Sequence, residues 1–367
     1  MSKLFEATTI NGMKLSNRFV RSATWEGMAD ADGNCTPELK DLYVQLAKGG
    51  VGLIITGVAY VRQDGMVAPR QLGLSDDKCI PIFEDMTDAI HQHGGRIAVQ
   101  LVHAGILSNP KVTGLTPLIL SKVEGYAGSE GREMTVDDIQ EIIEAHGQAA
   151  RRAKDAGFDA VQIHGAHGFL INQFLSPAFN KRTDEYGGLI ENRTKAAIEI
   201  IERVRSYVGD DYPVLFKLNS EDVIDGGLVV EDSLQAALLI QEAGIDAIEL
   251  SGGTVVTGDH ARKDINTEEK EAYWRKAARR FKEILNVPLM LVGGIRSLPL
   301  AEKLYDEGYA DYFSMSRPFI REAGLINRWA SGDLRKATCL SDNLCRGPLM
   351  EGGGIYCVVE ERQKEKI

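Results

Sequence analysis

Four segments of this chain repeat one pattern: the end of a helix, a glycine and a short apolar strand. The glycine stands where a helix commonly ends in a left-handed residue. The strands are nearly continuous in apolar residues, as parallel strands buried on both faces must be. The pattern predicts strands that alternate with helices around a buried sheet. The four segments are KGGVGLIITG (48–57), DAGFDAVQIHG (155–165), EAGIDAIELSG (242–252) and DEGYADYFSMS (306–316).

Four more strand candidates lie between these segments, and amphipathic helical segments separate them. The stretch 135–154 is typical, because its apolar residues fall on one helical stripe and Thr135 with Asp138 resembles a capping box. Eight strands alternating with helices favour a (β/α)8 TIM barrel over a doubly wound sheet. The further strands are RFVRS (18–22), RIAVQL (96–101), PVLFKL (213–218) and VPLMLV (287–292).

No linker or low-complexity tract interrupts the chain, which predicts one barrel domain over residues 1–335. Within it, TTINGMKL carries an Asn-Gly turn between apolar runs, so residues 1–16 are expected to form a β-hairpin that closes the bottom of the barrel. Residues 336–367 form a short C-terminal tail that contains cysteines.

Charge and composition narrow the class of protein. The net charge of -11, from 42 Lys and Arg against 53 Asp and Glu, argues against binding to nucleic acid or to an anionic membrane. The chain has no apolar run near the length of a membrane span, and its N-terminus lacks a signal-peptide core. Five thinly spread cysteines suit a reducing compartment. We therefore expect a cytoplasmic protein that acts on a small molecule.

Two loops at the expected top of the barrel suit phosphate. Gly293 and Gly294 follow strand seven and precede a helix near Ser297, and Ser316 with Arg317 follows strand eight. Glycines let the backbone approach an anion, helix N-termini offer free N–H groups, and arginine matches phosphate geometry. Each loop alone is equally well explained as a tight turn or a surface arginine. Together, at the positions this fold favours, they predict a ligand that carries phosphate.

Lys217 lies in the fifth strand, toward the mouth of the barrel, and leaves three alternatives open. It could form a Schiff base, place positive charge beside a cofactor, or pair with a carboxylate such as Glu221 or Asp222. Gln100, in strand three, is expected to hydrogen-bond at the rim of the site.

His164 and His167 follow strand four. An H-x-x-H pair can bind zinc, but zinc needs further ligands, and no partner is evident nearby in sequence. Two histidines at a barrel mouth are better explained as donors of ring N–H groups to an oxygen atom of a ligand.

The stretch HGAHGFLINQFLSPAFNKRTDEYGG (164–188) strongly resembles the signature of the Old Yellow Enzyme flavoproteins. The resemblance is greatest to the bacterial NADH:flavin oxidoreductase branch, which includes the barrel domain of 2,4-dienoyl-CoA reductase. Further matching motifs occur in order along almost the whole chain: NRFVRSAT (17–24), GLIITG (52–57), VQLVHAG (99–105), LFKLN (215–219), VGGIRS (292–297) and MSRPFIRE (315–322).

The resemblance implies FMN held without a covalent bond at the top of the barrel. It places Lys217 near N1 and O2 of the flavin, where a cation stabilises the charge of the reduced ring. Gln100 would bond the pyrimidine side, and Gly57 and Val58 would approach the ring edge. The residues expected to contact FMN are Ser22, Ala23, Thr24, Gly57, Val58, Gln100, Lys217, Gly293, Gly294, Ser316 and Arg317.

The implied reaction is a ping-pong reduction of an activated alkene, of enone or enoyl type. NADH or NADPH delivers hydride to the flavin, and an acceptor then takes the same place and receives it. His164 and His167 would hydrogen-bond the oxygen of the substrate, and Trp25 stands where smaller residues often tune the flavin. Relatives commonly self-associate, so the resemblance also allows a homo-oligomer.

Phe169 departs from the family, which usually has a tyrosine here that protonates the substrate carbon. Phenylalanine has no proton to give. Either another donor such as Tyr60, Tyr126 or water acts, or protonation is slow, or the acceptor needs no proton at carbon, as with quinones or oxygen. We expect weak ene reduction with ordinary flavin reduction.

The tail is a second departure. Cys339, Cys345 and Cys357 resemble the iron–sulfur motif of the dienoyl-CoA reductases, but Asp342 stands where the second cysteine belongs. Carboxylate is a poor substitute for thiolate. A degenerate remnant, or at most a zinc site with Asp342 as fourth ligand, is favoured over a [4Fe–4S] cluster.

Three alternatives remain open. An NADH oxidase or quinone-type reductase would use the same flavin on a different acceptor. A non-redox phosphate-binding lyase or aldolase would use Lys217 as its nucleophile and would be colourless. A flavin-binding protein without catalysis would be yellow and would not bleach with a nicotinamide.

Overall fold

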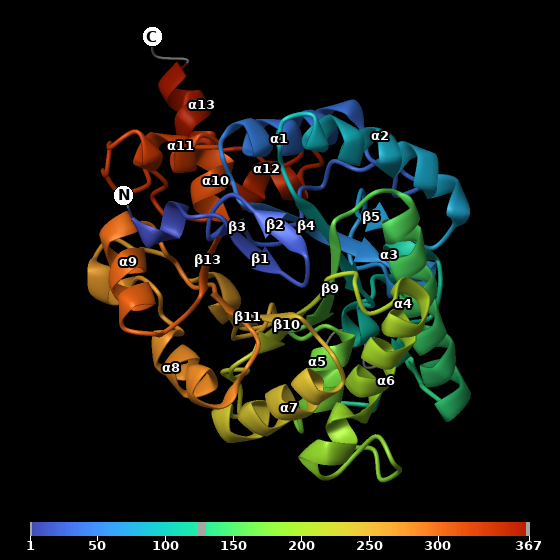
Figure 1. Ribbon diagram of the computed structural model, residues 1–367. Helices are drawn as coiled ribbons and strands as arrows, with labels where there is room; N and C mark the ends of the chain where they lie inside the picture. The colour runs from blue at the N-terminus through green and yellow to red at the C-terminus, as the bar shows by residue number, and fades with distance from the viewer. Residues whose placement is uncertain (1, 124–129, 365–367) are drawn as a thin grey trace.

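A closed barrel of eight parallel strands forms the centre of the molecule (Figure 1). The computed structural model describes residues 2–123 and 130–364. The last barrel strand pairs in parallel with the first, and the first with the second, which closes the sheet. This confirms the predicted (β/α)8 fold. In order the barrel strands are β3 (Phe19–Arg21), β4 (Leu53–Tyr60), β6 (Ile97–Val102), β9 (Ala160–Gly165), β10 (Val214–Asn219), β11 (Ala247–Ser251), β12 (Leu289–Leu291) and β13 (Tyr312–Met315).

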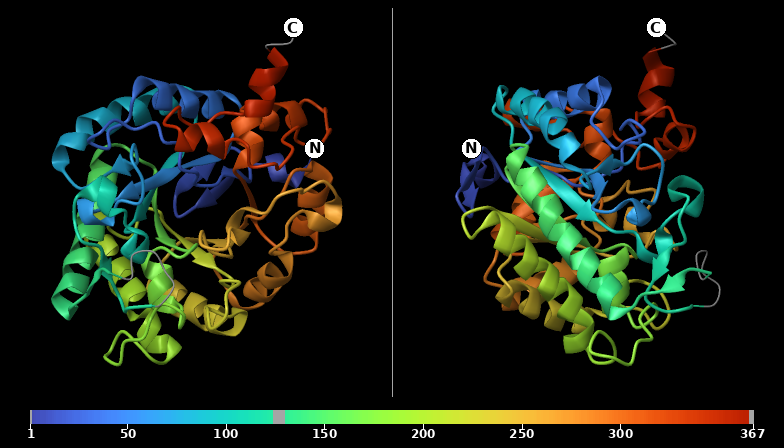
Figure 2. Two further views of the ribbon diagram at one scale, coloured as in Figure 1. Left: turned by 180° about the vertical axis from the view of Figure 1, so that it is seen from behind. Right: turned by 90° about the vertical axis from the view of Figure 1, so that its right-hand side faces the viewer.

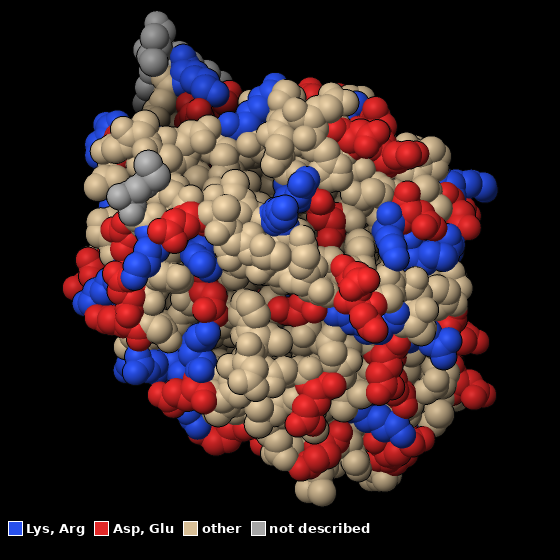
Figure 3. Space-filling view, viewed as in Figure 1, with Lys and Arg blue, Asp and Glu red and all other residues tan. Residues whose placement is uncertain are grey.

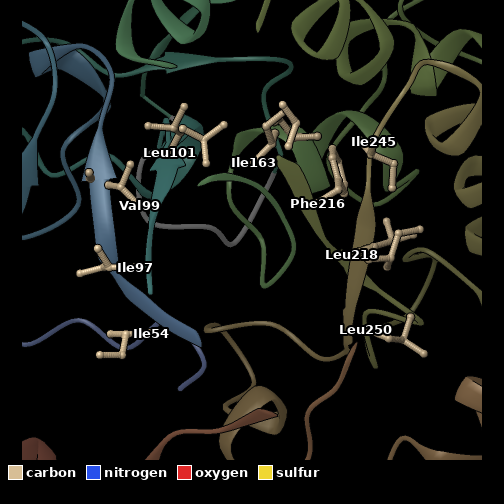
Figure 4. Packing of buried hydrophobic residues seen from close by; sticks show 14 of the residues in the cluster. Ile54, Ile97, Val99, Leu101, Ile163, Phe216, Leu218, Ile245 and Leu250 are labelled. Atoms are coloured by element: carbon tan, nitrogen blue, oxygen red, sulfur yellow. The ribbon is translucent and has the colours of Figure 1, made fainter. Parts of the chain in front are cut away.

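Helices surround the barrel and bury its outer surface. The outward side chains of the strands, such as Ile97, Val99 and Leu101 on β6, are fully buried in the main apolar cluster (Figure 4). Thr135 and Asp138 form the predicted capping box of α4. The helices are α1 (Pro37–Lys48), α2 (Ile80–His91), α3 (Pro110–Thr113), α4 (Val136–Asp155), α5 (Leu170–Leu175), α6 (Ile190–Val208), α7 (Val230–Glu242), α8 (Arg275–Ile284), α9 (Leu298–Asp306), α10 (Arg317–Arg321), α11 (Leu325–Ala330), α12 (Arg346–Met350) and α13 (Val358–Lys364).

The N-terminal strands form the expected hairpin. β1 (Thr8–Ile10) pairs antiparallel with β2 (Met13–Leu15) through a turn at Asn11 and Gly12, both with positive φ. Its apolar side chains pack on the first inward residues of the barrel strands, so the hairpin closes the N-terminal ends of the strands (Figure 1). Three short strands, β5 (Leu72–Gly73), β7 (Leu118–Ile119) and β8 (Arg132–Glu133), lie outside the barrel ring.

The interior of the barrel changes from apolar to polar along the strands. Because side chains alternate between the two faces of a strand, the inward positions lie two residues apart. Above the hairpin these positions are apolar, as at Ala98 on β6 and Leu215 on β10. Two residues further on, Gln100 and Lys217 take their place. A buried polar layer therefore lies at the C-terminal ends of the strands.

The C-terminal tail lies against that end of the barrel, as the view from behind indicates (Figure 2). Asn343 donates a hydrogen bond to the carbonyl of Ala261 at 2.9 Å, and Arg70 donates one to the carbonyl of Gly352. On the opposite face, which carries the hairpin, acidic and basic side chains intermingle without a continuous basic area (Figure 3). No helix within the described ranges is long and apolar enough to cross a membrane.

Candidate active site

The polar layer is a continuous chain of hydrogen bonds across the barrel. Gln100 Nε2 donates to Gln162 Oε1 at 2.7 Å, and Gln162 Nε2 donates to Glu249 Oε2 at 3.1 Å. Lys217 Nζ lies 3.1 Å from the same carboxylate oxygen and 3.0 Å from Ser22 Oγ. All five residues are buried. The sequence predicted Gln100, Lys217 and Ser22 here, but missed Gln162 and Glu249.

The ion pair of Lys217 corrects one expectation. Its partner is Glu249, which lies directly opposite it in the parallel register of β10 and β11, and not Glu221 or Asp222. Asp222 instead accepts hydrogen bonds from two asparagine side chains, one of which is Asn219. Burial raises the pKa of Glu249, but the charge of Lys217 and hydrogen bonds from Ser22, Lys217 and Ser314 together outweigh it, so the pKa is lowered and the carboxylate stays charged.

Two histidines stand above this layer. His164 is the second-last residue of β9. The rings of His164 and His167 meet edge to face with centroids 5.4 Å apart. His167 has φ +62, a left-handed conformation that is held where Asn219 Oδ1 accepts its backbone N–H. His167 Nε2 lies 2.7 Å from Ser251 Oγ, whereas Nδ1 of His164 is buried without a hydrogen-bond partner in the described part of the chain.

A third histidine, which the sequence did not single out, joins this pair. The ring of His260 lies 5.3 Å from that of His167, and His260 Nδ1 lies 3.0 Å from the carbonyl of Thr254. Its Nε2 lies 3.3 Å from the guanidinium of Arg346, which is in the tail. Because the Thr254 carbonyl is only an acceptor, His260 carries its proton on Nδ1. The tail thus reaches the edge of the histidine cluster.

These histidines are neutral, and their burial makes stability depend on pH. Burial lowers the pKa of His260 and of the core residue His146 to about 4, and moves those of His164 and His167 well below 6.5. Below pH 6.5 the unfolded chain therefore binds protons that the folded chain does not. The stabilisation that the neutral histidines contribute should be fully present above about pH 6.5 and decrease as the pH falls, by about 2 kcal/mol each for His146 and His260 near pH 5.

Urea unfolding at about pH 7 and about pH 5 measures this loss. A His146→Gln variant, which lacks one of the four groups, should lose less between the two conditions. Equal stability of the parent chain at both values would contradict the prediction.

Phe169 lies beside the histidines in an apolar setting. Its ring centroid is 4.6 Å from that of His164, and it packs in a cluster with Val58 and Trp25. The indole Nε1 of Trp25 is buried without a partner among the described residues. Of the suggested proton donors, Tyr60 donates its hydroxyl to the carbonyl of Asp32 at 3.0 Å. Tyr126 lies outside the described residues.

The loop after β12 leaves backbone donors free. No acceptor in the described residues takes the N–H groups of Gly293 and Gly294, both of which have positive φ. A Cβ at Gly294 would meet the ring of Tyr273 at 2.9 Å, so glycine is required there. The following donors are taken: Glu271 Oε2 accepts the backbone N–H groups of Arg296 and Ser297 at 2.8 and 3.0 Å. At this loop the N–H groups of the glycines are free, whereas those of Arg296 and Ser297 are occupied.

Ser316 and Arg317 follow β13 at the start of α10 and face the segment after β3 and the tail. Ser316 Oγ is 2.6 Å from the hydroxyl of Thr24, and Arg317 Nη1 donates to Asn343 Oδ1 at 2.6 Å. Arg317 has no carboxylate partner in the described ranges. A hydroxyl, an unneutralised guanidinium and two free N–H groups together fit a phosphate.

Close backbone approach marks the other side of the site. A Cβ at Gly57 would lie 2.3 Å from the side-chain oxygen Oε2 of Glu26 and 2.7 Å from the carbonyl of Thr24, so the segment after β3 packs directly against β4 there. Ala23 precedes Thr24 in the segment after β3, and Val58 follows Gly57 in β4. Of the predicted ring-side residues, Gly57 and Thr24 are therefore direct neighbours.

The three tail cysteines come together beside Arg317. Cys339, Cys345 and Cys357 line a cavity of about 20 Å³ together with Asp342. All three thiols are free. Within residues 2–123 and 130–364, no group of three or more His, Cys, Asp or Glu side chains is arranged to hold a metal ion.

Comparison with known sequences places the chain in a family. A profile described as the NADH:flavin oxidoreductase / NADH oxidase family matches residues 3–335. NADH oxidase of Thermoanaerobacter brockii is 36% identical over 348 residues, covering 93% of this chain and 53% of that relative. NADPH dehydrogenase of Bacillus subtilis (strain 168) is 35% identical over 321 residues, covering 87% of this chain and 92% of the relative. The chain thus spans about half of the first relative and most of the second.

Solved structures agree. A complex of 2-naphthoyl-CoA reductase with 2-naphthoyl-CoA has a TM-score of 0.89 and 28% identity, covering 97% of this chain and 56% of the other. The Old Yellow Enzyme homologue of Zymomonas mobilis has a TM-score of 0.79 and 27% identity, covering 92% and 96%. The chain belongs to the NADH:flavin oxidoreductase / NADH oxidase family, the Old Yellow Enzyme-like flavin oxidoreductases that its sequence resembles.

Proposed function

We propose that the chain binds FMN and uses NADH or NADPH to reduce an activated alkene of enone or enoyl type by a ping-pong reaction. The observation that carries the proposal is the neutral, buried histidine pair above a polar layer, with phosphate donors at one side. FMN, when bound, takes hydride from the nicotinamide and passes it to the acceptor.

The residues of the chain supply binding and orientation. The phosphate of FMN would be held by hydrogen-bond donors of four residues: Gly293, Gly294, Ser316 and Arg317. The backbone of Ser22, Ala23 and Thr24, with Gly57 and Val58, would border the ring. Gln100 and Lys217 would meet its pyrimidine side from the polar layer.

The histidines would act on the acceptor. A neutral imidazole donates one N–H, and Nδ1 of His164 has no hydrogen-bond partner among the described residues. A ring donor aimed at the carbonyl oxygen of the substrate stabilises the negative charge that develops there as hydride arrives. Trp25, whose indole N–H also lacks a partner in the part of the chain that the structure describes, would contribute to the substrate side.

Replacing His164 by alanine should therefore lower kcat for 2-cyclohexenone by about 10²-fold, the usual effect of losing one such donor. The rate at which NADH reduces the flavin should change little, because the substrate carbonyl that His164 would bind takes no part in that half-reaction. Stopped-flow measurement of both half-reactions separates the two. His91→Ala, at a partly exposed ion pair with Asp159, is the matched control, and an equal loss in both variants would refute the role of His164.

A second acceptor class is favoured by Phe169. The ring lies at the histidines with no proton to give, and Tyr60 is committed to a backbone carbonyl. Quinones and oxygen need no proton at carbon, so an NADH oxidase or quinone-type reductase is the alternative function. The lyase alternative is disfavoured, because the amine of Lys217 is held by Glu249 and Ser22.

Purification followed by addition of each nicotinamide under anaerobic conditions tests the proposal. We expect a yellow protein whose visible band bleaches with NADH or NADPH and returns with 2-cyclohexenone or with a quinone. Colourless protein, with a Schiff base that borohydride traps at Lys217, would establish the lyase instead. Yellow protein that neither nicotinamide bleaches would be a flavin-binding protein without this activity.

A further inference from the structure

A second cavity, of about 360 Å³, lies at the connection between β11 and α8. Its lining is strongly basic although the chain has a net charge of -11. Glu269 is the one acidic residue of the lining. The basic residues are Arg262, Lys263, Lys270, Arg275 and Lys276.

These five cations lack ion-pair partners in the described part of the chain. None forms an ion pair with a carboxylate within residues 2–123 and 130–364, and the Nε of Arg262 is buried without a hydrogen-bond partner there. Lys270 and Arg275 donate only to neutral oxygens, such as the side-chain carbonyl of Asn266. By contrast, Arg279 and Arg280, one turn further along α8, pair with carboxylates. The lack of ion pairs is therefore local to the cavity, where Arg262 stacks instead on the rings of Tyr273 and Trp274.

The helix end adds to the positive potential. Arg275 and Lys276 occupy the first turn of α8, which contains no acidic residue. The N-terminus of a helix carries partial positive charge and disfavours cations. Clustered cations at that end repel one another and the helix dipole, a cost that a bound anion removes.

The cavity borders the candidate active site. Tyr273 lines it and also lies against Gly294 of the phosphate loop, where a Cβ would meet the tyrosine ring. The hydroxyl of Tyr273 donates to the carbonyl of His260 at 3.3 Å, and the ring of His260 lies 5.3 Å from that of His167. A ligand held at the histidines can therefore extend into the cavity.

We propose that this cavity binds the phosphate groups of a nucleotide arm that belongs to a dissociable ligand of the enzyme. Two ligands of such a reaction carry a phosphorylated adenosine: NADPH, with a 2′-phosphate, and a coenzyme A thioester, with a 3′-phosphate. The shared chemistry is a polyanion that reaches the five cations while its reactive end lies at the histidines. Only the placement of the reactive end at the histidines rests on the proposed function.

Calorimetric binding of adenosine 2′,5′-bisphosphate and of adenosine 3′,5′-bisphosphate tests the cavity. In the double variant Lys263→Glu/Lys276→Glu, which changes two exposed residues, Kd for the preferred probe should rise about tenfold. The matched control is Lys14→Glu/Lys303→Glu, an equal charge change at exposed residues outside the cavity, and it should bind like the parent.

Each result decides something. Tighter binding of the 2′,5′ probe assigns the cavity to NADPH, tighter binding of the 3′,5′ probe assigns it to a thioester, and equal binding supports the shared phosphate chemistry. No binding, or equal loss in both double variants, overturns the proposal. The binding measurement needs no turnover, so it is independent of the activity. Colourless protein that binds a probe would refute the proposed flavin function and support the phosphate site in the cavity. Yellow protein that bleaches with NADH but binds neither probe would support the flavin function and refute the phosphate site.

Discussion

Phe169→Tyr should raise the rate of 2-cyclohexenone reduction by about 10²-fold or more, the range expected when a positioned acid is added to a protonation step. The ring centroid lies 4.6 Å from that of His164, so in the proposed arrangement a hydroxyl added to this ring would lie beside the substrate. The measurement is the oxidative half-reaction of the prereduced enzyme, followed by the return of the flavin band. A fast half-reaction in the parent that the substitution leaves unchanged would show that another group already donates the proton.

The controls separate proton donation from altered packing. Reduction of menadione, which needs no proton at carbon, should stay within about twofold of the parent in the same variant, far below a general-acid effect. Phe174→Tyr adds the same hydroxyl on α5, where the ring packs near Tyr186, and should leave enone reduction slow. Since Phe169 is buried, an unpaired hydroxyl would also lower stability by about 1–3 kcal/mol. Unfolding measured in the same samples detects that cost.

The sequence predicted the barrel because the information for it is local. Helix ends, their glycines and buried strands recur in order, and the left-handed glycines Gly50, Gly157, Gly244 and Gly308 are all present. Closure of the barrel then follows from eight such units. The residues at single strand ends, such as Lys217 and His164, were also predictable, because the fold places them at one face.

The partners of these residues were not predictable, because they depend on pairing between strands. Glu249 and Gln162 lie inside apolar strands, and a single sequence does not show which inward position faces which neighbour. Lys217 was therefore matched to carboxylates close in sequence, while the register of β10 and β11 sets Glu249 opposite it. His260 lies in the long β11–α8 connection, where the sequence has no helical or strand periodicity that would indicate which way its side chain points. A buried carboxylate in a strand such as AIELS was the available signal.

Glu249→Gln should lower the free energy of unfolding by about 3–5 kcal/mol, since it leaves a buried charge without its partner. The side chains of Lys217 and Glu249 are 3% and 0% exposed, so water cannot compensate. Replacing both, as Lys217→Met/Glu249→Gln, should recover most of the loss, because a neutral pair has no charge to desolvate. Urea unfolding of the two variants and of Lys217→Met completes the cycle. A double variant as unstable as the worse single variant would mean that the pair contributes by packing and not by charge.

The same substitution tests whether this pair lies beside the flavin. In the proposed arrangement Glu249 offsets the charge that Lys217 presents to the ring, so Glu249→Gln should raise the reduction potential of the bound cofactor by about 30 mV, which is about 1.4 kcal/mol for a two-electron couple. Dye equilibration near pH 7 measures it. Glu231→Gln, which removes an exposed partner of Arg280, is the matched control and should leave the potential unchanged. An unchanged potential in Glu249→Gln would place the pair outside the electrostatic environment of the flavin. A charge at hydrogen-bond range in a buried site changes the potential of the group beside it, because little water screens it.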